Sequence, residues 1–164
     1  KCIKVDEFQQ LPNLIKTSNI KKLLLNDKIE KANKFLYSKY RFYGFVEEGY
    51  KIGRSLNFPT ANINVGKEQI IPSNGVYSVN LLVGAKKYKS ICNIGVCPTL
   101  HDRREKSIEV HIIDKSLDLY NCKVEVEFIK YIRKEKKFNT QRELKEQIKN
   151  DIESVKEERI IKSE

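Results

Sequence analysis

The sequence predicts a mainly β protein in which an antiparallel sheet closes into a barrel. From Arg41 onward, short segments of alternating apolar and polar residues are separated by Gly, Asn, Pro and Ser. A period of two is typical of strands with one buried face. Five or six such segments follow one another without helices between them, which favours an antiparallel barrel over a parallel α/β sheet. Helical periodicity is confined to the residues before Arg41 and to the end of the chain.

The N-terminal part of the chain is expected to form two short helices. Residues 1–14 show no period, and we leave them unassigned. Over 18–25 and 28–37, apolar residues recur every three or four positions, as they do on one face of a helix. Asn26 and Asp27 separate the two stretches, because both residue types favour turns.

The strands are expected to begin with the segment 42–46. An extended segment should follow Pro59, and the strand 75–83 should end at Gly84. The remaining strands are expected at 88–94, 107–114 and 123–131. In the last of these, Val124, Val126 and Phe128 should face the core. Glu125, Glu127 and Lys130 should face water on the other side.

The C-terminal region predicts a helix. Thr140 and Glu143 fit a capping box, in which each side chain accepts a hydrogen bond from the other residue's backbone amide. The apolar stripe after this cap is made of Leu144, Ile148, Ile152 and Val155. We expect the helix to lie on the barrel by this stripe.

Length and composition exclude several classes of protein. A chain of 164 residues and 19.2 kDa supports one ordinary domain with a short appendage. No apolar run approaches the ~18 residues that span a bilayer, so no membrane association is expected. The net charge is +10, but the lysines are scattered among glutamates. That pattern is typical of a solvated surface and leaves nucleic-acid binding open.

The number and spacing of the cysteines indicate the cellular compartment of the protein. The 4 cysteines have neither the spacing of a zinc site nor the density of a disulfide scaffold, so we expect reduced thiols and a cytoplasmic location. Because the sequence contains no methionine, we also expect it to be a fragment of a longer protein.

A glycine-containing segment is the first candidate site. Gly49, Gly53 and Arg54 suit a loop whose amides approach a polyphosphate while a guanidinium neutralises it. After Pro59, an extended chain would place Thr60 and Asn62 on one face, within reach of one hard cation. A plain turn followed by a strand explains the same residues.

The second candidate is Glu109. Alternation places Ile108 and Val110 on one face of a strand, so Glu109 and His111 share the other. There Glu109 could act as a general base that takes a proton from a hydroxyl group. An ordinary solvent-facing glutamate is the alternative interpretation.

Seven motifs follow one another over roughly residues 40–152. They are Gly53–Asn62, with its Pro-Thr-Ala-Asn element, Gly75–Tyr77, Asn93–Thr99, Glu109–His111, Asp118–Tyr120, Arg133–Phe138 and Gln147–Asp151. This order resembles the riboflavin kinases, and most closely the kinase module of the bacterial bifunctional riboflavin kinase/FAD synthetases. Asn57 and Asn121 stand where the family usually has glycine. Asparagine is the best non-glycine occupant of a left-handed conformation, so both turns are expected to persist.

This resemblance implies a six-stranded antiparallel barrel that transfers the γ-phosphate of ATP to the ribityl 5′-hydroxyl of riboflavin, giving FMN and ADP. It implies that Glu109 is the base and that Thr60 and Asn62 hold Mg²⁺ and the phosphates. It implies no tightly bound cofactor. The other nucleotide-binding residues that it implies are Gly49, Gly53, Arg54, Asn93, Gly95, Asp118, Leu119 and Tyr120. Arg133, Glu135 and Phe138 would bind the flavin.

The resemblance also implies a domain organisation. Residues 40–164 would be the kinase domain, and residues 1–39 resemble the end of an adenylyltransferase domain whose remainder would lie upstream. No His-x-Gly-His motif occurs, so no FAD synthesis is expected from these residues. Two alternatives are kept: a non-catalytic barrel that binds flavin or nucleotide, and a basic barrel that binds nucleic acid. Glutamates on the predicted strands disfavour the second, so no nucleic-acid partner is expected.

Overall fold

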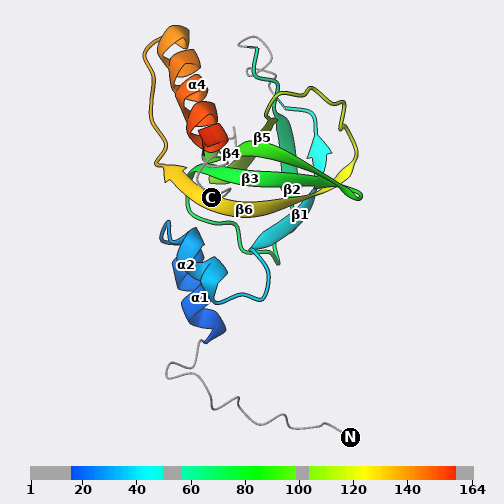
Figure 1. The fold of residues 1–164 in the computed structure, drawn as a ribbon, viewed down its shortest axis with the longest axis vertical. Helices are drawn as coiled ribbons and strands as arrows, with labels where there is room; N and C mark the ends of the chain where they lie inside the picture. The colour runs from blue at the N-terminus through cyan, green and yellow to red at the C-terminus, as the bar shows by residue number, and fades with distance from the viewer. Residues whose placement is uncertain (1–15, 50–56, 99–103, 158–164) are drawn as a thin grey trace, which may run out of the picture.

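The protein is a closed six-stranded barrel flanked by helices (Figure 1). The structure, a computed structural model, describes residues 16–49, 57–98 and 104–157. The strands are β1 (Arg41–Glu47), β2 (Ala61–Val65), β3 (Gly75–Val83), β4 (Lys86–Pro98), β5 (Arg104–Ile112) and β6 (Lys123–Arg133). Their order around the barrel is β1-β2-β5-β4-β3-β6, and every pairing is antiparallel. The predicted fold class is confirmed.

The ladders between neighbouring strands of the barrel differ greatly in length. β3 and β4 form a hairpin from Gly75↔Ile94 to Val83↔Lys86, and the turn contains Gly84 at φ 57°. The strand 75–83 therefore has the bounds that its sequence predicts. By contrast, the described ladder between β2 and β5 joins Ala61 to Val110 and Asn62 to Glu109. The short β2–β5 contact leaves the chain before Ala61 outside the sheet.

Close approach of β1 and β2 depends on a glycine. Phe42 and Val46 alternate with exposed residues along β1 and are buried. Gly44 lies between them, where a Cβ atom would overlap the carbonyl oxygen of Asn64 and come within 2.7 Å of Ile63 Cγ2. A larger residue would therefore push the two strands apart.

Aromatic rings fill the centre of the core. Phe128 lies 5.3 Å from Phe42 and 5.2 Å from Tyr77, measured between ring centroids. The Tyr77 and Phe128 rings meet edge to face, at 86°. Such pairs contribute about 0.5–1.5 kcal/mol beyond the area they bury. Val124, Val126 and Phe128 of β6 are buried, as their alternation predicts.

The prediction that Glu127 faces water is wrong. Its outward direction on β6 agrees with alternation, but the residue is only 6% exposed. It accepts hydrogen bonds from Asn80 Nδ2 at 2.7 Å and Lys87 Nζ at 3.0 Å. Side chains from β3 and β4 therefore cover this carboxylate on the outside of the barrel.

The N-terminal helices are α1 (Thr17–Leu24) and α2 (Ile29–Lys34), separated as predicted at Asp27, which has φ 58°. The second helix was expected to continue to residue 37 but ends at Lys34. Asn33 explains the difference, because its Oδ1 accepts from the Tyr40 amide at 2.7 Å while its Nδ2 donates to the Phe128 carbonyl at 2.9 Å. The chain must turn after α2 to bring Tyr40 to these partners.

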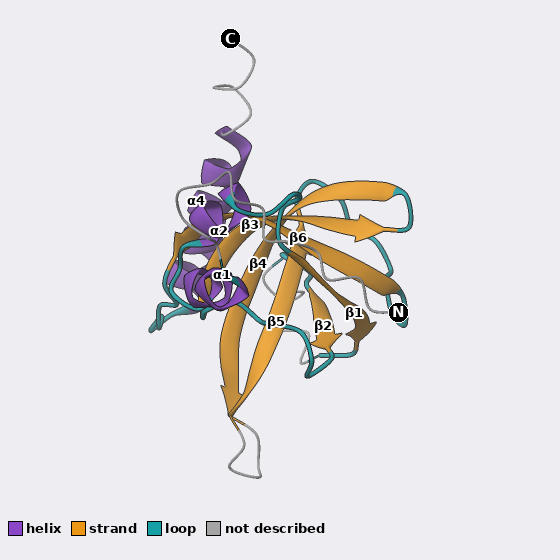
Figure 2. Ribbon diagram, turned by 90° about the horizontal axis from the view of Figure 1, so that it is seen from below, coloured by secondary structure: helices purple, strands orange, loops and turns teal. Residues whose placement is uncertain are grey.

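The last helix, α4 (Gln141–Glu157), stands beside the barrel (Figures 1 and 2). Thr140 caps it by accepting from the Glu143 amide at 3.2 Å, whereas Glu143 accepts from the Asn139 amide, one residue earlier than a capping box predicts. Val155 is buried, and the rest of the apolar stripe is only half-buried. Part of this stripe borders a cavity. Within the described residues, no helix has the length and apolarity needed to cross a membrane.

Candidate active site

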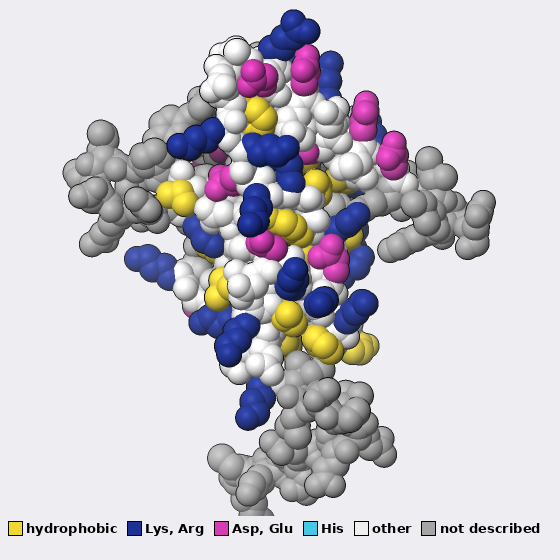
Figure 3. All heavy atoms as spheres, turned by 90° about the vertical axis from the view of Figure 1, so that its left-hand side faces the viewer, with side chains coloured by type: hydrophobic (Ala, Val, Ile, Leu, Met, Phe, Trp, Pro, Cys, Tyr) yellow, Lys and Arg dark blue, Asp and Glu magenta, His cyan; other side chains and the backbone are white. Residues whose placement is uncertain are grey.

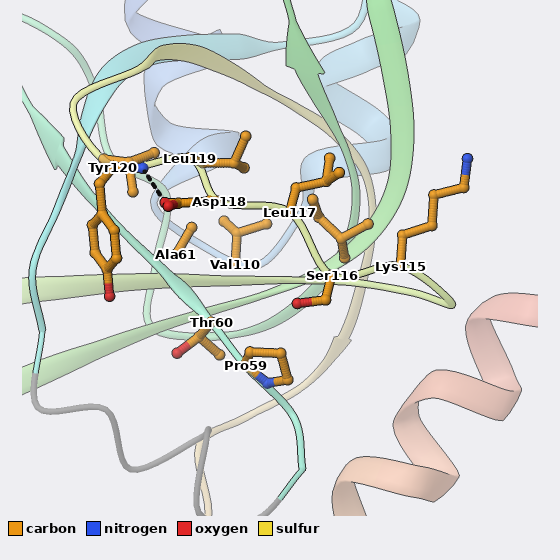
Figure 4. A pocket seen from close by; sticks show the side chains of 12 residues that line it. Pro59, Thr60, Ala61, Val110, Lys115, Ser116, Leu117, Asp118, Leu119 and Tyr120 are labelled. Carbon is orange, nitrogen blue, oxygen red and sulfur yellow. Dashed lines mark hydrogen bonds between the residues drawn. The ribbon is translucent and has the colours of Figure 1, made fainter.

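Two cavities adjoin at Thr60. The loop cavity, of about 290 Å³, lies between residues 59–61 and the loop 115–120 (Figure 4). The helix cavity, of about 350 Å³, lies between β5, the segment after β6 and α4. Thr60 lines both cavities, and Glu109 lines the helix cavity. Each space is large enough to hold part of a substrate, and the two meet beside one carboxylate.

Polar side chains form a row across three strands at this point. In the sheet register, Glu109 of β5 pairs with Asn62 of β2 on one side and Asn93 of β4 on the other. Directly paired residues of antiparallel strands project to the same face. Thr60 joins the row because its Oγ1 donates to Glu109 Oε2 at 3.4 Å. The sheet therefore assembles a carboxylate, two amides and a hydroxyl from three separate parts of the sequence.

Apolar neighbours hold Glu109 in this orientation. Ile108 and Val110 are buried, as alternation predicts, so the side chain between them projects away from the core. Cys92 lies behind it, fully buried on β4. Burial raises the pKa of the Cys92 thiol and the nearby Glu109 charge raises it further, so this cysteine stays protonated.

Gly49 packs directly against the row. A Cβ atom at this position would overlap the side-chain amide of Asn62, so only glycine lets the backbone approach so closely. The other two residues of the expected phosphate loop, Gly53 and Arg54, lie outside the described residues.

The loop cavity collects the Asp-Leu-Tyr element (Figure 4). Asp118 Oδ1 accepts from the Tyr120 amide at 3.3 Å, and Leu119 is buried. Asn121 comes next in the chain with φ 60° and donates its amide to the Val46 carbonyl at 3.0 Å, which fixes the turn on β1. Asn57 has φ 66°. Both asparagines therefore keep left-handed turns, as predicted.

The helix cavity collects the residues expected at a flavin. Arg133, Glu135 and Phe138 line it together with Glu109. Asn93 also lies there rather than in the loop cavity, and a Cβ atom at Gly95 would come within 2.5 Å of Glu135 Oε1. Asn93 and Gly95, which were expected beside the nucleotide, thus lie close to residues that were expected beside the flavin.

Every nitrogen of the Arg133 guanidinium donates a hydrogen bond within the protein. Its Nε donates to both carboxylate oxygens of Asp151 at 3.0 Å, and its Nη2 donates to Asp151 Oδ2 at 2.7 Å. Its Nη1 donates to the Lys134 carbonyl at 2.9 Å. The guanidinium therefore ties the end of β6 to α4, and these bonds leave one further N–H on each of Nη1 and Nη2.

A model described as riboflavin kinase, the Flavokinase family, matches residues 36–158. This range covers the barrel, both cavities and α4. The chain belongs to the riboflavin kinase family.

Two relatives of this riboflavin kinase family member are each about twice its length. A bifunctional riboflavin kinase/FMN adenylyltransferase from Bacillus subtilis is 38% identical over 152 residues, which are 92% of this chain and 48% of the relative. The protein of the same name from Buchnera aphidicola subsp. Schizaphis graminum is 45% identical over 145 residues, which are 87% of this chain and 46% of the relative. The chain thus spans about half the length of these relatives.

Solved structures share its fold. A Streptococcus pneumoniae structure titled as a macrolide-efflux protein superposes with a TM-score of 0.82 at 30% identity, over 87% of this chain and 46% of that one. A Trypanosoma brucei riboflavin kinase gives a TM-score of 0.50 at 19% identity, over 71% of this chain and 77% of that one. The second likeness shows the fold alone.

Sequence reasoning missed Asp151 as a residue of this riboflavin kinase family site. The residue is 4% exposed, lines the helix cavity and also accepts from Gln147 Nε2 at 2.8 Å. A signal was present, because Asp151 stands beside Ile152 and three positions after Ile148 on the apolar side of the helix. Its partner, however, lies 18 residues away.

Proposed function

We propose that this chain transfers the γ-phosphate of ATP to the 5′-hydroxyl of the ribityl chain of riboflavin, giving FMN and ADP. The observation that carries the proposal is the junction of two cavities at Thr60, with the Glu109 carboxylate 3.4 Å from its hydroxyl. Phosphoryl transfer needs two substrates aligned at one point and a group that takes the proton of the attacking hydroxyl.

The chemistry of the linings suggests which substrate each cavity holds. Phe58, Phe138 and Ile148 give the helix cavity apolar and aromatic surfaces, which suit the planar isoalloxazine ring. Lys115, Ser116 and Asp118 give the loop cavity polar groups, which suit a nucleotide. Glu109 and Thr60 then stand where the ribityl end of the flavin would meet the γ-phosphate.

In this mechanism Glu109 accepts the proton of the ribityl hydroxyl as the oxygen forms its bond to the γ-phosphorus. The bond from that phosphorus to the bridging oxygen breaks, and ADP leaves with the electron pair. Gly49 permits the close backbone approach behind Asn62, and we assign Gly53 and Arg54 to covering the phosphates.

The residues present fit a magnesium ion bound with ATP. Thr60 and Asn62 supply hydroxyl and amide oxygens beside the Glu109 carboxylate, and Mg²⁺ prefers such hard oxygen donors. The described residues contain no cluster of three or more His, Cys, Asp or Glu that could hold a metal. Substrate phosphates and water would therefore complete the coordination. When bound, the ion would neutralise charge on the phosphate oxygens.

The domain organisation and location are part of the same proposal. We assign residues 40–164 to the kinase domain and residues 1–39 to the end of an adenylyltransferase domain, which the bifunctional names and doubled length of the relatives support. We assign the chain to the cytoplasm, which the free thiols of Cys92 and Cys122 support.

A nucleic-acid-binding function has less support. On the face shown in Figure 3, Asp and Glu side chains lie among the Lys and Arg side chains in the upper and middle parts, and Lys and Arg predominate in the lower part. On the barrel, Arg41 pairs with Glu125 and Lys87 pairs with Glu127. A nucleic-acid groove requires unpaired basic residues interleaved with aromatic ones.

The experiment is to incubate the purified chain with riboflavin, ATP and Mg²⁺ and to separate riboflavin, FMN and FAD by chromatography. We expect FMN and ADP in equal amounts and no FAD. Riboflavin binding without FMN would support a non-catalytic binder and contradict the proposal. FAD formed from FMN and ATP would contradict the assignment of adenylyl transfer to an upstream domain.

A further inference from the structure

A side-chain hydrogen bond stands where the β2–β5 ladder stops. The described ladder begins at Ala61↔Val110, and Pro59 precedes it without a backbone N–H to donate. His111 Nδ1 lies 2.8 Å from the Pro59 carbonyl oxygen. Because a carbonyl can only accept, Nδ1 carries the hydrogen and donates it. The imidazole therefore gives the Pro59 carbonyl a hydrogen-bond donor just before the described ladder begins.

The same ring also contacts the preceding residue. The rings of His111 and Phe58 meet edge to face at 86°, with their centroids 5.6 Å apart. His111 therefore contacts both residues that lead into Thr60. Since Asn57 turns the chain with φ 66°, this contact lies directly after a change of backbone direction.

The hydroxyl at the junction of the cavities belongs to the residue directly after Pro59. Thr60 lies between the anchored Pro59 carbonyl and the first ladder pair at Ala61, and its Oγ1 reaches Glu109 at 3.4 Å. His111 stands two residues after Glu109 on the same face of β5. One strand therefore supplies both the carboxylate and the group that fixes its hydroxyl partner.

We propose that His111 is a positioning residue for phosphoryl transfer, which sets Thr60 relative to Glu109 by donating a hydrogen bond to Pro59. This role rests on the proposed kinase function. A displacement of about 1 Å in a reacting group can lower a rate by about 10²-fold. Loss of the hydrogen bond should therefore lower kcat more than it changes the KM for riboflavin.

Three variants separate the hydrogen bond from the ring. In His111→Asn, the side-chain amide can place an N–H on the same branch as Nδ1. His111→Leu has a similar branched shape without a donor, and His111→Phe keeps the ring contact without a donor. We expect His111→Leu and His111→Phe to lose about 10- to 100-fold in kcat with KM within about 3-fold, and His111→Asn to recover most of the loss.

A second measurement does not depend on catalysis. Hydrogen exchange of the Thr60, Ala61 and Asn62 amides should accelerate in His111→Leu and His111→Phe but not in His111→Asn. Melting temperatures of all variants would verify that each is folded. If His111→Phe matches the native chain in kcat and exchange, the anchoring role is wrong. If His111→Asn is as impaired as His111→Leu, the imidazole acts in another way.

The two proposals can fail separately. If the native chain makes no FMN, the kinase function is wrong, while the exchange pattern of the variants still tests the anchor. If the native chain makes FMN and the exchange rates are equal in all variants, the kinase function stands and the positioning role is wrong.

Discussion

At the scale of single residues, the site depends on where strand alternation points each side chain. Glu109 projects away from the core because Ile108 and Val110 are buried on either side of it. The sequence predicts this orientation, and the sheet adds Asn62 and Asn93 as direct neighbours. A carboxylate beside a hydroxyl and two amides is equipped to hold and move a proton.

The first prediction concerns the charge of Glu109. Glu109→Gln keeps the shape of the side chain but cannot accept the hydroxyl proton, so turnover should fall by roughly 10²–10⁴-fold. Nucleotide binding, measured by calorimetry, should persist. Glu125→Gln, on an exposed part of β6, is the matched control and should leave turnover unchanged. An unchanged rate in Glu109→Gln would remove this residue from the mechanism.

The second prediction concerns the Thr60 hydroxyl. Thr60→Ala removes an oxygen at the junction of the cavities, so magnesium-dependent ATP affinity should fall by about 10-fold or more, and the rate should fall with it. Thr60→Ser keeps the hydroxyl and should stay much closer to the native chain. The test is ATP titration with and without Mg²⁺. Equal affinities in Thr60→Ala and the native chain would contradict the assignment.

At the scale of elements, contacts between strands decide whether an outward-facing side chain is exposed or covered, which alternation alone does not predict. Alternation predicts that Glu127 points outward, but Asn80 of β3 and Lys87 of β4 cover it. Burial of Glu127 favours its neutral form, yet these partners outweigh that effect and hold its pKa below the ordinary value of 4.5. The carboxylate therefore stabilises the fold while it is ionised.

The third prediction is the pH dependence of that stability. Because the folded pKa of Glu127 is lowered, its contribution should be fully present above about pH 4.5 and lost as the pH falls through the folded value. Urea unfolding of Glu127→Gln and the native chain should therefore differ most near neutral pH and converge in acid. Glu125→Gln, whose pair with Arg41 is exposed, should show little difference. A constant difference at every pH would contradict this explanation.

The fourth prediction concerns the attachment of α4. The Arg133 and Asp151 side chains are 16% and 5% exposed and form an ion pair between β6 and the helix. Asp151→Leu leaves a largely buried guanidinium without its partner, so the free energy of unfolding should fall by about 3–5 kcal/mol. The double variant Arg133→Met with Asp151→Leu removes both charges and should recover much of that loss. Urea unfolding measures both effects. A double variant no more stable than Asp151→Leu would contradict this explanation.

At the scale of the whole molecule, barrel closure brings together segments that are far apart in the chain. The helix cavity is lined by Phe58 and Thr60 before β2, by β5 and by residues after β6. These segments meet because the barrel places β5 beside β2 on one side and beside β4 on the other, with β3 next to both β4 and β6. Local patterns predicted the strands and the helices. The strand order depends on contacts between distant residues, so periodicity alone could not predict it.

The differences from the sequence predictions have the same origin. α2 ends at Lys34 because Asn33 binds Tyr40 and Phe128, and Phe128 is 95 residues away in the chain. Asp151 lies in the Gln147–Asp151 motif but was given no role in the site, because its partner Arg133 lies on another element. The resemblance to riboflavin kinases assigned the candidate residues to one site, whereas periodicity predicted only the element on which each one lies. Gly53 and Arg54 stay predictions, since they lie outside the described residues.

The most direct test of the central claim tracks the γ-phosphate itself. The purified chain would be mixed with riboflavin, Mg²⁺ and ATP that carries a radioactive γ-phosphorus, and the products separated over a single turnover. The account predicts label in FMN, dependent on riboflavin and strongly reduced in Glu109→Gln. Label only in inorganic phosphate, or only in unreacted ATP while riboflavin is bound, would contradict it.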